Sequence, residues 1–453
     1  MDFAGKKIVV IGMGKTGIAV AGFLGKRGAK VVATDEKPFD QWGGEFQQIA
    51  KEKWLEAGDY NVRILKDADM VVPSPGVAPR NDLLVEALKN NIPVVSEIEL
   101  AYWFLKVPII AVTGTNGKTT TTTLLGQILQ RSGKKIFVGG NIGNPLIEYA
   151  DTAQQDDFIV AEISSFQLQW IEKFHPSIAM LLNITCDHIN YHGSFTEYRR
   201  IKAGIFANQK NTDLAILNAA DQEQEGIANS IKARVVKFSS QGALPEGIFV
   251  NNNNIILKMS GMPDMPDMNE EKYPLNMINL PGSHNVENVM AAVMAARFCG
   301  CSRKDIISAV TAFRGLPHRI EFVSEKNSVR FYDDSKGTNV GSVLRALETF
   351  SEPVILLLGG RDKDGDFETL KPMLTAKAKK IILFGEARER IASLIGEDVP
   401  VLKKMKLREA IENAYKEARS GDVVLLSPGC ASFDEFTNYK ERGNFFQDVV
   451  RNL

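Results

Sequence analysis

The sequence predicts an α/β protein built from three domains. Its 453 residues exceed what a single hydrophobic core usually accommodates. Short apolar runs alternate with helix-like segments, which is typical of parallel sheets flanked by helices. This alternation starts again near residues 98 and 316. We therefore predict domains over residues 1–97, 98–315 and 316–453.

Strands and helices alternate in the first predicted domain. The segment KIVVIGMG is an apolar strand that runs into a glycine turn, and an amphipathic helix follows it up to Gly28. Similar apolar runs recur three times, so we expect four parallel strands. They lie within residues 7–14, 29–36, 68–76 and 92–100.

The second predicted domain continues this pattern and then departs from it. Strands are expected within residues 107–114, 134–141, 157–165 and 177–185. Residues 235–258 contain short strands around an Asn-rich turn, which predicts an antiparallel hairpin. We expect a loop over 259–274, where Pro and Met are spaced, and a helix over 282–300, which is rich in small residues.

The third predicted domain repeats the strand and helix pattern of the first. Its first strands lie within residues 319–335, and apolar strands follow within 353–360, 380–385 and 422–429. The domains are similar in pattern, but no sequence repeat relates them.

Composition argues against several classes of function. Hydrophobic residues make up 44% of the chain, charged residues 24%, and the formal net charge is −1. With so little net charge, no long-range field attracts nucleic acid or an anionic membrane. No apolar run reaches the roughly 18 residues of a membrane span, and the N-terminus resembles a strand rather than a signal peptide. The four cysteines are few and lack paired metal spacing, and Cys299-Gly-Cys301 alone is a weak motif, so we expect a cytoplasmic protein.

A short phosphate-binding loop follows the apolar strand that begins at Pro108. The segment TGTNGKT leads from Thr113 into a helix whose first residues are threonines. Its glycines allow backbone N–H groups to point at phosphate oxygens, and the helix N-terminus adds partial positive charge. Lys118 is expected to reach the β- and γ-phosphates, and the Thr119 hydroxyl to bind Mg²⁺. The usual pattern has a glycine six residues before the lysine, but Val112 stands there, so this loop is a shortened form.

A second glycine cluster lies near the N-terminus. The segment Gly12-Met13-Gly14-Lys15-Thr16-Gly17 follows a strand and opens a helix, and Asp35 ends the next strand. This is the spacing of a Rossmann dinucleotide fingerprint, which offers a pyrophosphate cradle. NAD and a nucleotide-sugar diphosphate fit it equally well. The segment Ser74-Pro75-Gly76 would flank the same crevice, although alone it resembles a plain turn.

Candidate metal ligands lie in the second predicted domain. Glu162 ends an apolar strand, where it would bind Mg²⁺ or orient a water molecule beside the phosphate loop. His188 and His192 have helical spacing but no obvious third soft ligand, so we expect one near Mg²⁺ and the other to be structural. Lys202 lies in a predicted helix. As a lone lysine it would be a solvated side chain, and the alternative is an amine carbamylated by CO₂.

Taken in order, the motifs of this chain resemble those of the Mur ligases, the ATP-dependent amide ligases of peptidoglycan precursor synthesis. The matching segments are TGTNGKT, AEISSFQL, NITCDHINYH, YRRIKAGIF, GSHNVEN, LPHRIEFV and DDSKGTN. Three further features resemble the group that adds D-glutamate: GMGKTG, SPGVAP and the C-terminal SPGCASFDEFTNYKERGNFF. The resemblance implies a Rossmann-like N-terminal domain, a central P-loop ATPase-type domain and a Rossmann-like C-terminal domain.

The resemblance also implies the reaction and its partners. ATP would phosphorylate the carboxylate of UDP-N-acetylmuramoyl-L-alanine, and the amine of D-glutamate would attack the acyl phosphate. The implied cofactors are two Mg²⁺ ions and a carbamate on Lys202. A monomer is expected, without nucleic-acid or membrane partners. Domain closure would exclude water from the acyl phosphate.

Site residues follow from the matching motifs. Lys118, Glu162, His188 and Lys202 would be catalytic, and Thr119 would join the last three in binding metal. ATP would contact Gly114, Thr115, Asn116, Gly117, Lys118, Thr119, Thr120, Thr121, Asn288, Arg319, Asp334 and Lys336. The UDP substrate would contact Thr16, Glu36, Lys37, Ser74, Pro75, Gly76 and Asn141. D-Glutamate would contact Thr338, Lys363, Ser432 and Tyr439, of which Tyr439 replaces a usual Phe.

Three other functions compete with this one. A related amide ligase, such as the alanine-adding Mur ligase or a folylpolyglutamate synthase, would use the same phosphate loop. An NAD-dependent oxidoreductase would use Gly12, Gly14, Gly17 and Asp35, but it leaves Lys118 unexplained. A non-catalytic P-loop protein or a regulatory ATPase would need no amino acid.

Overall fold

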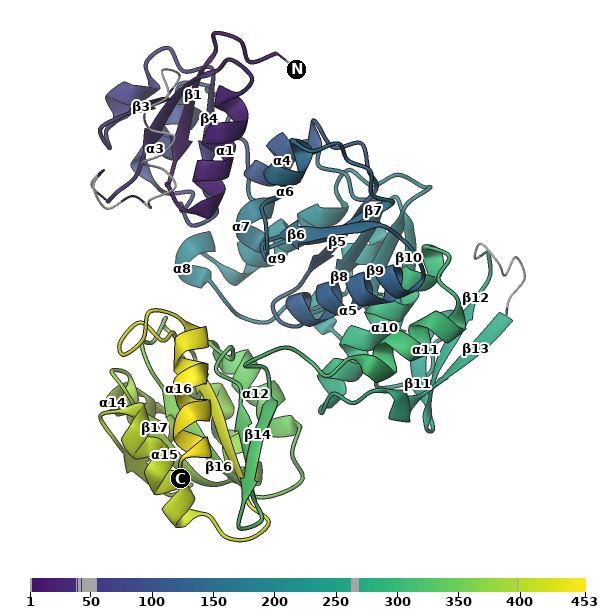
Figure 1. Cartoon of the computed structure of the whole chain (residues 1–453), viewed down its shortest axis with the longest axis vertical. Helices are drawn as coiled ribbons and strands as arrows, with labels where there is room; N and C mark the ends of the chain where they lie inside the picture. Colours follow the sequence, from purple (N-terminus) through teal and green to yellow (C-terminus); the bar gives the residue numbers. More distant parts are fainter. Residues whose placement is uncertain (1, 38, 40–41, 43–54, 262–268, 397) are drawn as a thin grey trace. The chain divides into compact units, whose positions relative to one another are not determined.

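A computed structural model describes residues 2–37, 39, 42, 55–261, 269–396 and 398–453 (Figure 1). The described residues form three separate sheets with helices packed on them, which confirms the predicted α/β class. Contacts divide the chain into two compact units, Met1–Pro274 with Asn288–Ala309, and Leu275–Glu287 with Val310–Leu453. The first unit holds two sheets and the second holds one. The domain boundaries near residues 98 and 316 stay a prediction.

The first sheet is parallel, with strand order β3-β2-β1-β4. Because β1 and β4 are neighbours, the glycine turn after β1 and the Ser74 segment after β4 meet at the same edge of the sheet. The elements are β1 (Lys7–Ile11), α1 (Lys15–Gly25), β2 (Lys30–Thr34), β3 (Leu55–Ala57), β4 (Met70–Pro73), α3 (Asp82–Lys89) and α4 (Glu97–Tyr102).

The fourth strand expected within residues 92–100 is wrong. Only an isolated bridge joins Val94 to Val71, and α4 begins directly after it. The Ser96 hydroxyl accepts a hydrogen bond from the backbone N–H of Glu99 at 3.4 Å, which is an N-terminal helix cap. The Glu99 carboxylate accepts the backbone N–H groups of residues 172–174, so a charged side chain is buried at a position that the strand pattern assigned to a sheet. β3 was not predicted.

The central sheet has the order β13-β12-β11-β10-β9-β8-β5-β7-β6 and is parallel from β6 to β11. Strand β5 lies between β7 and β8, so the turns after these three strands converge, as is typical of ligand sites in open α/β sheets. Its strands are β5 (Ile109–Thr113), β6 (Ile136–Gly140), β7 (Phe158–Glu162), β8 (Ile178–Leu181), β9 (Leu214–Asn218), β10 (Arg234–Ser239), β11 (Gly247–Asn251), β12 (Asn254–Met259) and β13 (Asn269–Pro274).

Helices α5 to α9 lie between strands of this sheet in the chain, and α10 and α11 follow β13 (Figure 1). They are α5 (Lys118–Arg131), α6 (Leu146–Ala150), α7 (Ser165–Leu168), α8 (Ile189–His192), α9 (Phe195–Ala203), α10 (Ser283–Phe298) and α11 (Arg303–Ala312). The predicted helix within 282–300 is thus confirmed as α10. No helix among the described residues combines the length and apolar character needed to cross a membrane.

The antiparallel hairpin expected within 235–258 is confirmed by β11 and β12, which pair around a turn at Asn252 with φ +52°. The loop expected over 259–274 is partly wrong, because Asn269–Pro274 forms β13 and pairs antiparallel with β12. Residues 262–268 of that segment lie outside the described residues.

The sheet of the second unit has the order β14-β15-β19-β16-β17-β18, and only β14 runs antiparallel to its neighbour. Alternate residues of β16 face opposite sides: Leu356 packs toward α12, α13 and α14, and Leu357 toward α15 and α16. The elements are β14 (Glu321–Lys326), β15 (Val329–Asp333), α12 (Val340–Glu348), β16 (Val354–Gly359), α13 (Lys371–Lys377), β17 (Ala378–Phe384), α14 (Arg388–Ile395), β18 (Val401–Lys403), α15 (Leu407–Glu417), β19 (Val423–Gly429) and α16 (Tyr439–Arg451).

Candidate active site

The predicted phosphate loop joins β5 to α5. Its backbone requires glycine at Gly114 and Gly117, whose φ angles are +152° and +87°. A Cβ at Gly117 would also lie 2.2 Å from Oδ1 of Asn288 in α10. Asn288 accepts a hydrogen bond from the Thr121 hydroxyl at 3.4 Å. The structure thus brings Asn288, a predicted ATP contact 167 residues away in sequence from Thr121, to the first turn of α5.

Residues after β8 brace this loop. Asn183 Oδ1 accepts the backbone N–H of Asn116 at 2.8 Å, and Asn183 Nδ2 donates to the Asn116 carbonyl at 3.0 Å. The Thr115 hydroxyl lies 3.0 Å from the Tyr198 hydroxyl and accepts the backbone N–H of Thr185 at 3.0 Å. The loop is therefore held by the side chains of Asn183, after β8, and Tyr198, on α9. Neither residue was predicted from the sequence as part of the site.

Two lysine ammonium groups meet at the carbonyl of Gly114. Lys118 Nζ donates to this oxygen at 2.7 Å and to the Thr115 carbonyl at 2.8 Å. Lys202 Nζ, on α9, donates to the same Gly114 oxygen at 2.8 Å. Burial, followed by the positive charge of Lys118, lowers the pKa of Lys202 well below its ordinary value, while Glu162 and Asp187 oppose this shift. The Lys202 side chain is 1% exposed, so the prediction of a solvated lysine is wrong.

Glu162 ends β7 next to β5, in register with Val112. It is 2% exposed. One carboxylate oxygen accepts a hydrogen bond from Asn141 Nδ2 at 2.7 Å, and the other has no hydrogen-bond partner. A buried carboxylate oxygen without a donor is energetically costly unless a cation compensates it. This donor set therefore suits a divalent metal ion.

The two histidines of the NITCDHINYH segment have different environments. His188 precedes α8 with φ +54°, and its imidazole lies about one third exposed, edge-on to the Phe166 ring. His192 is buried, and its Nε2 lies 2.9 Å from the Ser165 hydroxyl. Burial lowers the pKa of His192 to about 4, so its imidazole is neutral at pH 7. His188 is the histidine that is accessible to a ligand.

A cavity of about 750 Å³ lies at the carboxyl ends of β1 and β4 and extends to the segment after β6. Seven residues were predicted to contact the UDP substrate, and Lys37 does not line this cavity. The other six do: Thr16, Glu36, Ser74, Pro75, Gly76 and Asn141. The Ser74 hydroxyl donates to the Gly12 carbonyl at 2.6 Å, so the glycine turn and the Ser-Pro-Gly segment do flank one crevice.

Other side chains in this cavity were not predicted as ligand contacts. Tyr60 donates to Glu36 Oε1 at 3.2 Å and accepts a hydrogen bond from Asn81, and Arg80 adds a positive charge to the lining. Lys15 Nζ donates to the Gly143 carbonyl at 2.8 Å and to Asn144 Oδ1 at 2.9 Å. Arg80 follows the SPGVAP segment, so a basic residue at the end of that motif was the available signal. Tyr60 lay in a segment without a motif.

In the second unit, the predicted ATP residues Arg319, Asp334 and Lys336 lie beside one another. The Asp334 carboxylate accepts a hydrogen bond from the Ser427 hydroxyl at 2.8 Å. Burial raises the pKa of Asp334 to about 7, while Ser427 and the charge of Arg319 act in the opposite direction. The Lys336 backbone N–H donates to the His318 carbonyl at 3.0 Å.

Three of the four predicted D-glutamate residues lie on neighbouring segments of this unit. Lys336 Nζ lies 4.2 Å from the centre of the Tyr439 ring, and the Tyr439 carbonyl accepts a hydrogen bond from the Ser335 hydroxyl. Thr338 lies two residues after Lys336 in the DDSKGTN segment, and its backbone N–H donates to the Lys336 carbonyl. Ser432 is buried after β19. Lys363 is exposed on the loop after β16, where its charge acts on the Cys430 thiol.

Comparison with known protein families finds three matching domains. Residues 6–96 match the Mur ligase MurD-like N-terminal domain, residues 112–296 the Mur ligase middle domain, and residues 318–430 the Mur ligase glutamate ligase domain. These segments contain both glycine turns and the DDSKGTN segment.

Full-length relatives carry one common name. The UDP-N-acetylmuramoylalanine–D-glutamate ligase of Syntrophus aciditrophicus is 53% identical over 453 residues, covering 100% of this chain and 99% of the relative. The ligase of the same name from Geobacter metallireducens is 42% identical over 462 residues, with 100% and 99% coverage.

Solved structures of similar fold are more distant in sequence. A pseudomurein peptide ligase type C from Methanothermus fervidus superimposes with a TM-score of 0.61 at 20% identity, covering 99% of this chain and 100% of that one. MurF from Acinetobacter baumannii gives a TM-score of 0.62 at 18% identity, covering 99% and 91%. The fold agrees with these structures, the three domain matches agree with the full-length relatives, and the chain therefore belongs to the Mur ligase family.

Proposed function

We propose that this protein is an ATP-dependent ligase that joins D-glutamate to UDP-N-acetylmuramoyl-L-alanine, in cytoplasmic peptidoglycan precursor synthesis. The observation that carries the proposal is the cluster around the Gly114 carbonyl, where Lys118, Lys202 and the unpaired oxygen of Glu162 are held by α5, α9 and β7. Relatives that bear this ligase name and align over the full length support the choice of substrates.

The proposed ATP contacts begin at the phosphate loop. The segment from Gly114 to Thr121 contacts ATP, and backbone N–H groups at the N-terminus of α5 bind its phosphate oxygens. Lys118 reaches the β- and γ-phosphates, because its ammonium lies within the loop itself. Asn288, Arg319, Asp334 and Lys336 contribute the remaining contacts. The resemblance of the GSHNVEN, LPHRIEFV and DDSKGTN segments supports this last set.

Two Mg²⁺ ions fit the donors around the phosphate loop. Thr119 and Glu162 would hold one ion, and His188 with Lys202 the other. Bound Mg²⁺ would neutralise the charge of the phosphates and of the substrate carboxylate. The unpaired Glu162 oxygen supports the first assignment, and the His188 imidazole, about one third exposed, supports the second.

Lys202 is suited to carbamylation. Only an unprotonated amine attacks CO₂, and the lowered pKa of Lys202 favours this form. The carbamate would replace a cation by an anionic oxygen ligand and would thus remove the repulsion between Lys202 and Lys118. Lys202 is 1% exposed, so this amine is kept from water, and the Tyr198 ring lies 4.8 Å from its Nζ.

The UDP substrate occupies the cavity of the first unit. Thr16 and the N-terminus of α1 bind the diphosphate, and Glu36 with Ser74, Pro75 and Gly76 bind the nucleoside side. Asn141 contacts the sugar or peptide end and also hydrogen-bonds Glu162. One side chain therefore connects the substrate cavity with the phosphate-loop cluster.

Amide formation requires two displacements. The alanine carboxylate attacks the γ-phosphorus of ATP, which releases ADP and leaves an acyl phosphate. The D-glutamate amine then attacks the acyl carbon, and phosphate leaves as the amide forms. Lys118 stabilises the phosphoryl group by charge, and Thr338, Lys363, Ser432 and Tyr439 hold the D-glutamate carboxylates so that its amine is oriented.

The test is phosphate release in the presence of ATP and Mg²⁺. Release should require both UDP-N-acetylmuramoyl-L-alanine and D-glutamate, and mass spectrometry should find the product. A screen of other amino acids, including L-glutamate and L-alanine, checks the choice of acceptor. Release without an amino acid would indicate a simple ATPase, and turnover of NADH would indicate an oxidoreductase; either result would overturn the proposal.

A further inference from the structure

We propose that His318 is a positioning residue of the ligase reaction: it fixes the loop of residues 333–338, which carries Asp334 and Lys336, by binding Asp333 and Lys336. The inference rests on the proposed function, because the loop is assigned to ATP there. No substrate contact is assigned to His318. It acts by positioning Asp334 and Lys336, which are assigned to ATP.

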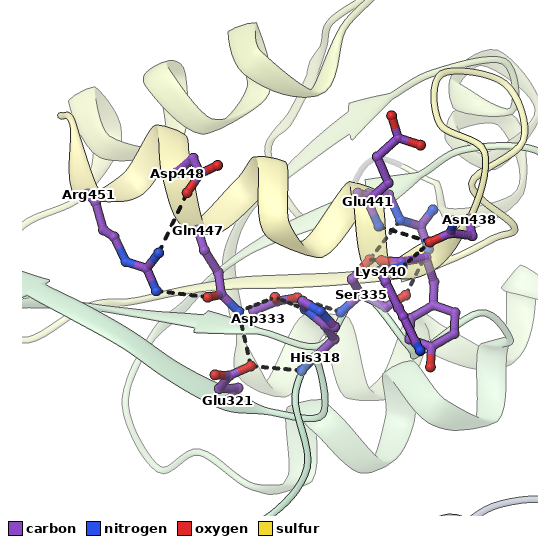
Figure 2. Close-up of polar contacts among 12 residues, drawn as sticks. His318, Glu321, Asp333, Ser335, Asn438, Lys440, Glu441, Gln447, Asp448 and Arg451 are labelled. Atoms are coloured by element: carbon purple, nitrogen blue, oxygen red, sulfur yellow. Dashed lines mark hydrogen bonds and ion pairs between the residues drawn. The ribbon is translucent and has the colours of Figure 1, made fainter. Parts of the chain in front are cut away.

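The His318 side chain is turned into the protein by its backbone. Its φ is +63°, in the left-handed region that non-glycine residues seldom adopt, and the residue is 5% exposed. Its backbone N–H donates to Glu321 Oε2 at 2.8 Å. The imidazole Nδ1 lies 2.7 Å from Asp333 Oδ2 (Figure 2). The strained backbone is thus compensated by two hydrogen bonds to carboxylates.

Asp333 depends on these donors because it is fully buried at the end of β15. Besides His318, Gln447 Nε2 donates to Oδ2 at 2.9 Å, and the Ser335 backbone N–H donates to Oδ1 at 2.8 Å. A buried carboxylate with three donors has a single preferred orientation. Asp333 thereby fixes the start of the 333–338 loop.

The carbonyl of His318 fixes the other part of the loop. It accepts the backbone N–H of Lys336 at 3.0 Å. The side chain and the main chain of one residue thus bind the loop on both sides of Asp334. The His318 ring also meets the Tyr439 ring edge-on, with centroids 6.2 Å apart, and Lys336 Nζ lies over that same ring. His318 therefore borders the proposed ATP and D-glutamate residues.

Helix α16 closes over the histidine at a glycine. A Cβ at Gly443 would lie 2.2 Å from His318 Nδ1 and 2.8 Å from Asp333 Oδ2. One turn later, Gln447 bridges Asp333 and Glu321, with 3.0 Å to the latter (Figure 2). Tyr439 begins the same helix, so the position of α16 and that of the loop depend on one hydrogen-bonded cluster.

The side chains of His318, Glu321 and Asp333 are of the types that bind metal ions, but their contacts favour a hydrogen-bonding role. Ligand atoms of His318, Glu321 and Asp333 lie within 4.8 Å of one another. However, both Asp333 oxygens and Glu321 Oε2 already accept N–H groups from the protein. A cation would have to displace these donors.

The test compares His318→Ala with His318→Asn in the full-length enzyme. Alanine removes the bond to Asp333. Asparagine places an amide N–H near the position of Nδ1 and tolerates a positive φ. Because the loop is assigned to ATP, His318→Ala should raise the KM for ATP at least tenfold and lower kcat. The KM for the UDP substrate, whose cavity lies in the first unit, should stay within twofold. His318→Asn should recover most of the loss.

The matched control is Arg451→Ala. Arg451 donates to Gln447 Oε1 at 3.0 Å, at the outer end of the same cluster, and contacts neither His318 nor Asp333 (Figure 2). It should leave all KM values within twofold. If His318→Ala is unstable, Asp333→Asn gives the same measurement, since it weakens the same bond while conserving size.

Two results would overturn the proposal. One is an unchanged KM for ATP in a folded His318→Ala enzyme. The other is an equal rise in all three KM values that His318→Asn does not reverse, which is the result of a purely structural role. Wild-type enzyme that forms no amide would instead refute the proposed function, so the two failures are distinguishable.

Discussion

At the scale of single residues, burial explains why the two lysines at the Gly114 carbonyl have different chemistry. Both ammonium groups donate to this oxygen. Lys118 lies at the start of α5 and is half-buried, whereas Lys202 is fully enclosed and its pKa is lowered. The first therefore lies where it can bind phosphate, and the lowered pKa of the second favours a neutral nucleophile.

Replacing Lys118 by Ala should reduce amide formation by about 100- to 1000-fold, because the charge on the transferred phosphoryl group loses its main protein cation. Affinity for the UDP substrate, measured by calorimetry, should be unchanged, since that cavity is lined by other residues. Amide synthesis at wild-type rate in Lys118→Ala would contradict the role of the phosphate loop.

Replacing Lys202 by Ala should also inactivate the enzyme, but this loss should be partly reversible. A short-chain carboxylate such as acetate can occupy the space of the lost side chain and supply the oxygen ligand of the carbamate. Activity should rise with acetate concentration in Lys202→Ala and not in Lys118→Ala, which serves as the control. Unchanged activity of Lys202→Ala without acetate would exclude the metal role.

At the scale of elements, α4 shows how burial decides what local pattern does not. The segment IPVVSEIEL, which runs into α4, alternates like a strand, yet its two glutamates are buried and accept backbone N–H groups. Glu97 Oε1 accepts the Ile147 N–H at 2.7 Å, and its second oxygen is buried without a partner. Local sequence carries no information about donors that lie 50 residues away.

Glu97 also makes stability depend on pH. Burial raises its pKa from 4.5 to about 7, against the N–H of Ile147. The folded protein therefore binds a proton that the unfolded chain releases between these pH values, so stability is present below pH 4.5 and is lost as pH rises through 7. The loss is of the order of 3 kcal/mol.

Glu97→Gln should remove this dependence. Its melting temperature should exceed that of the wild type at pH 8, and the advantage should vanish near pH 4.5. The control is Glu86→Gln, on the exposed face of α3. Its melting temperature should depend on pH in the same way as that of the wild type. Melting profiles of Glu97→Gln and wild type that stay parallel from pH 4.5 to 8 would contradict the raised pKa.

At the scale of the whole molecule, the residues proposed to bind ligands are divided between two compact units. The UDP cavity and the phosphate loop belong to the first. The DDSKGTN loop, Ser432 and Tyr439 belong to the second. Binding of one ligand should therefore stabilise one unit locally.

Hydrogen exchange can measure this division. UDP alone should slow exchange in residues 12–17 and 74–81, by up to about 100-fold at a concentration 100 times its Kd. Residues 333–339 should exchange at an unchanged rate. Equal protection of both segments by UDP would show that the units do not respond independently.

The sequence by itself determined the α/β class, the phosphate loop, six residues that line the proposed UDP cavity, and the hairpin of β11 and β12. These are local features, in which glycines, apolar runs and turn residues fix the backbone over a few positions. Only the tertiary structure decided that Lys202 is buried, that Asn183 and Tyr198 brace the loop, and that Tyr60 and Arg80 line the cavity. It also turned the expected strand at 92–100 into α4 and joined His318 to Gln447. In each case the partner comes from a distant segment, and burial beside that partner, rather than local propensity, sets the conformation and the charge.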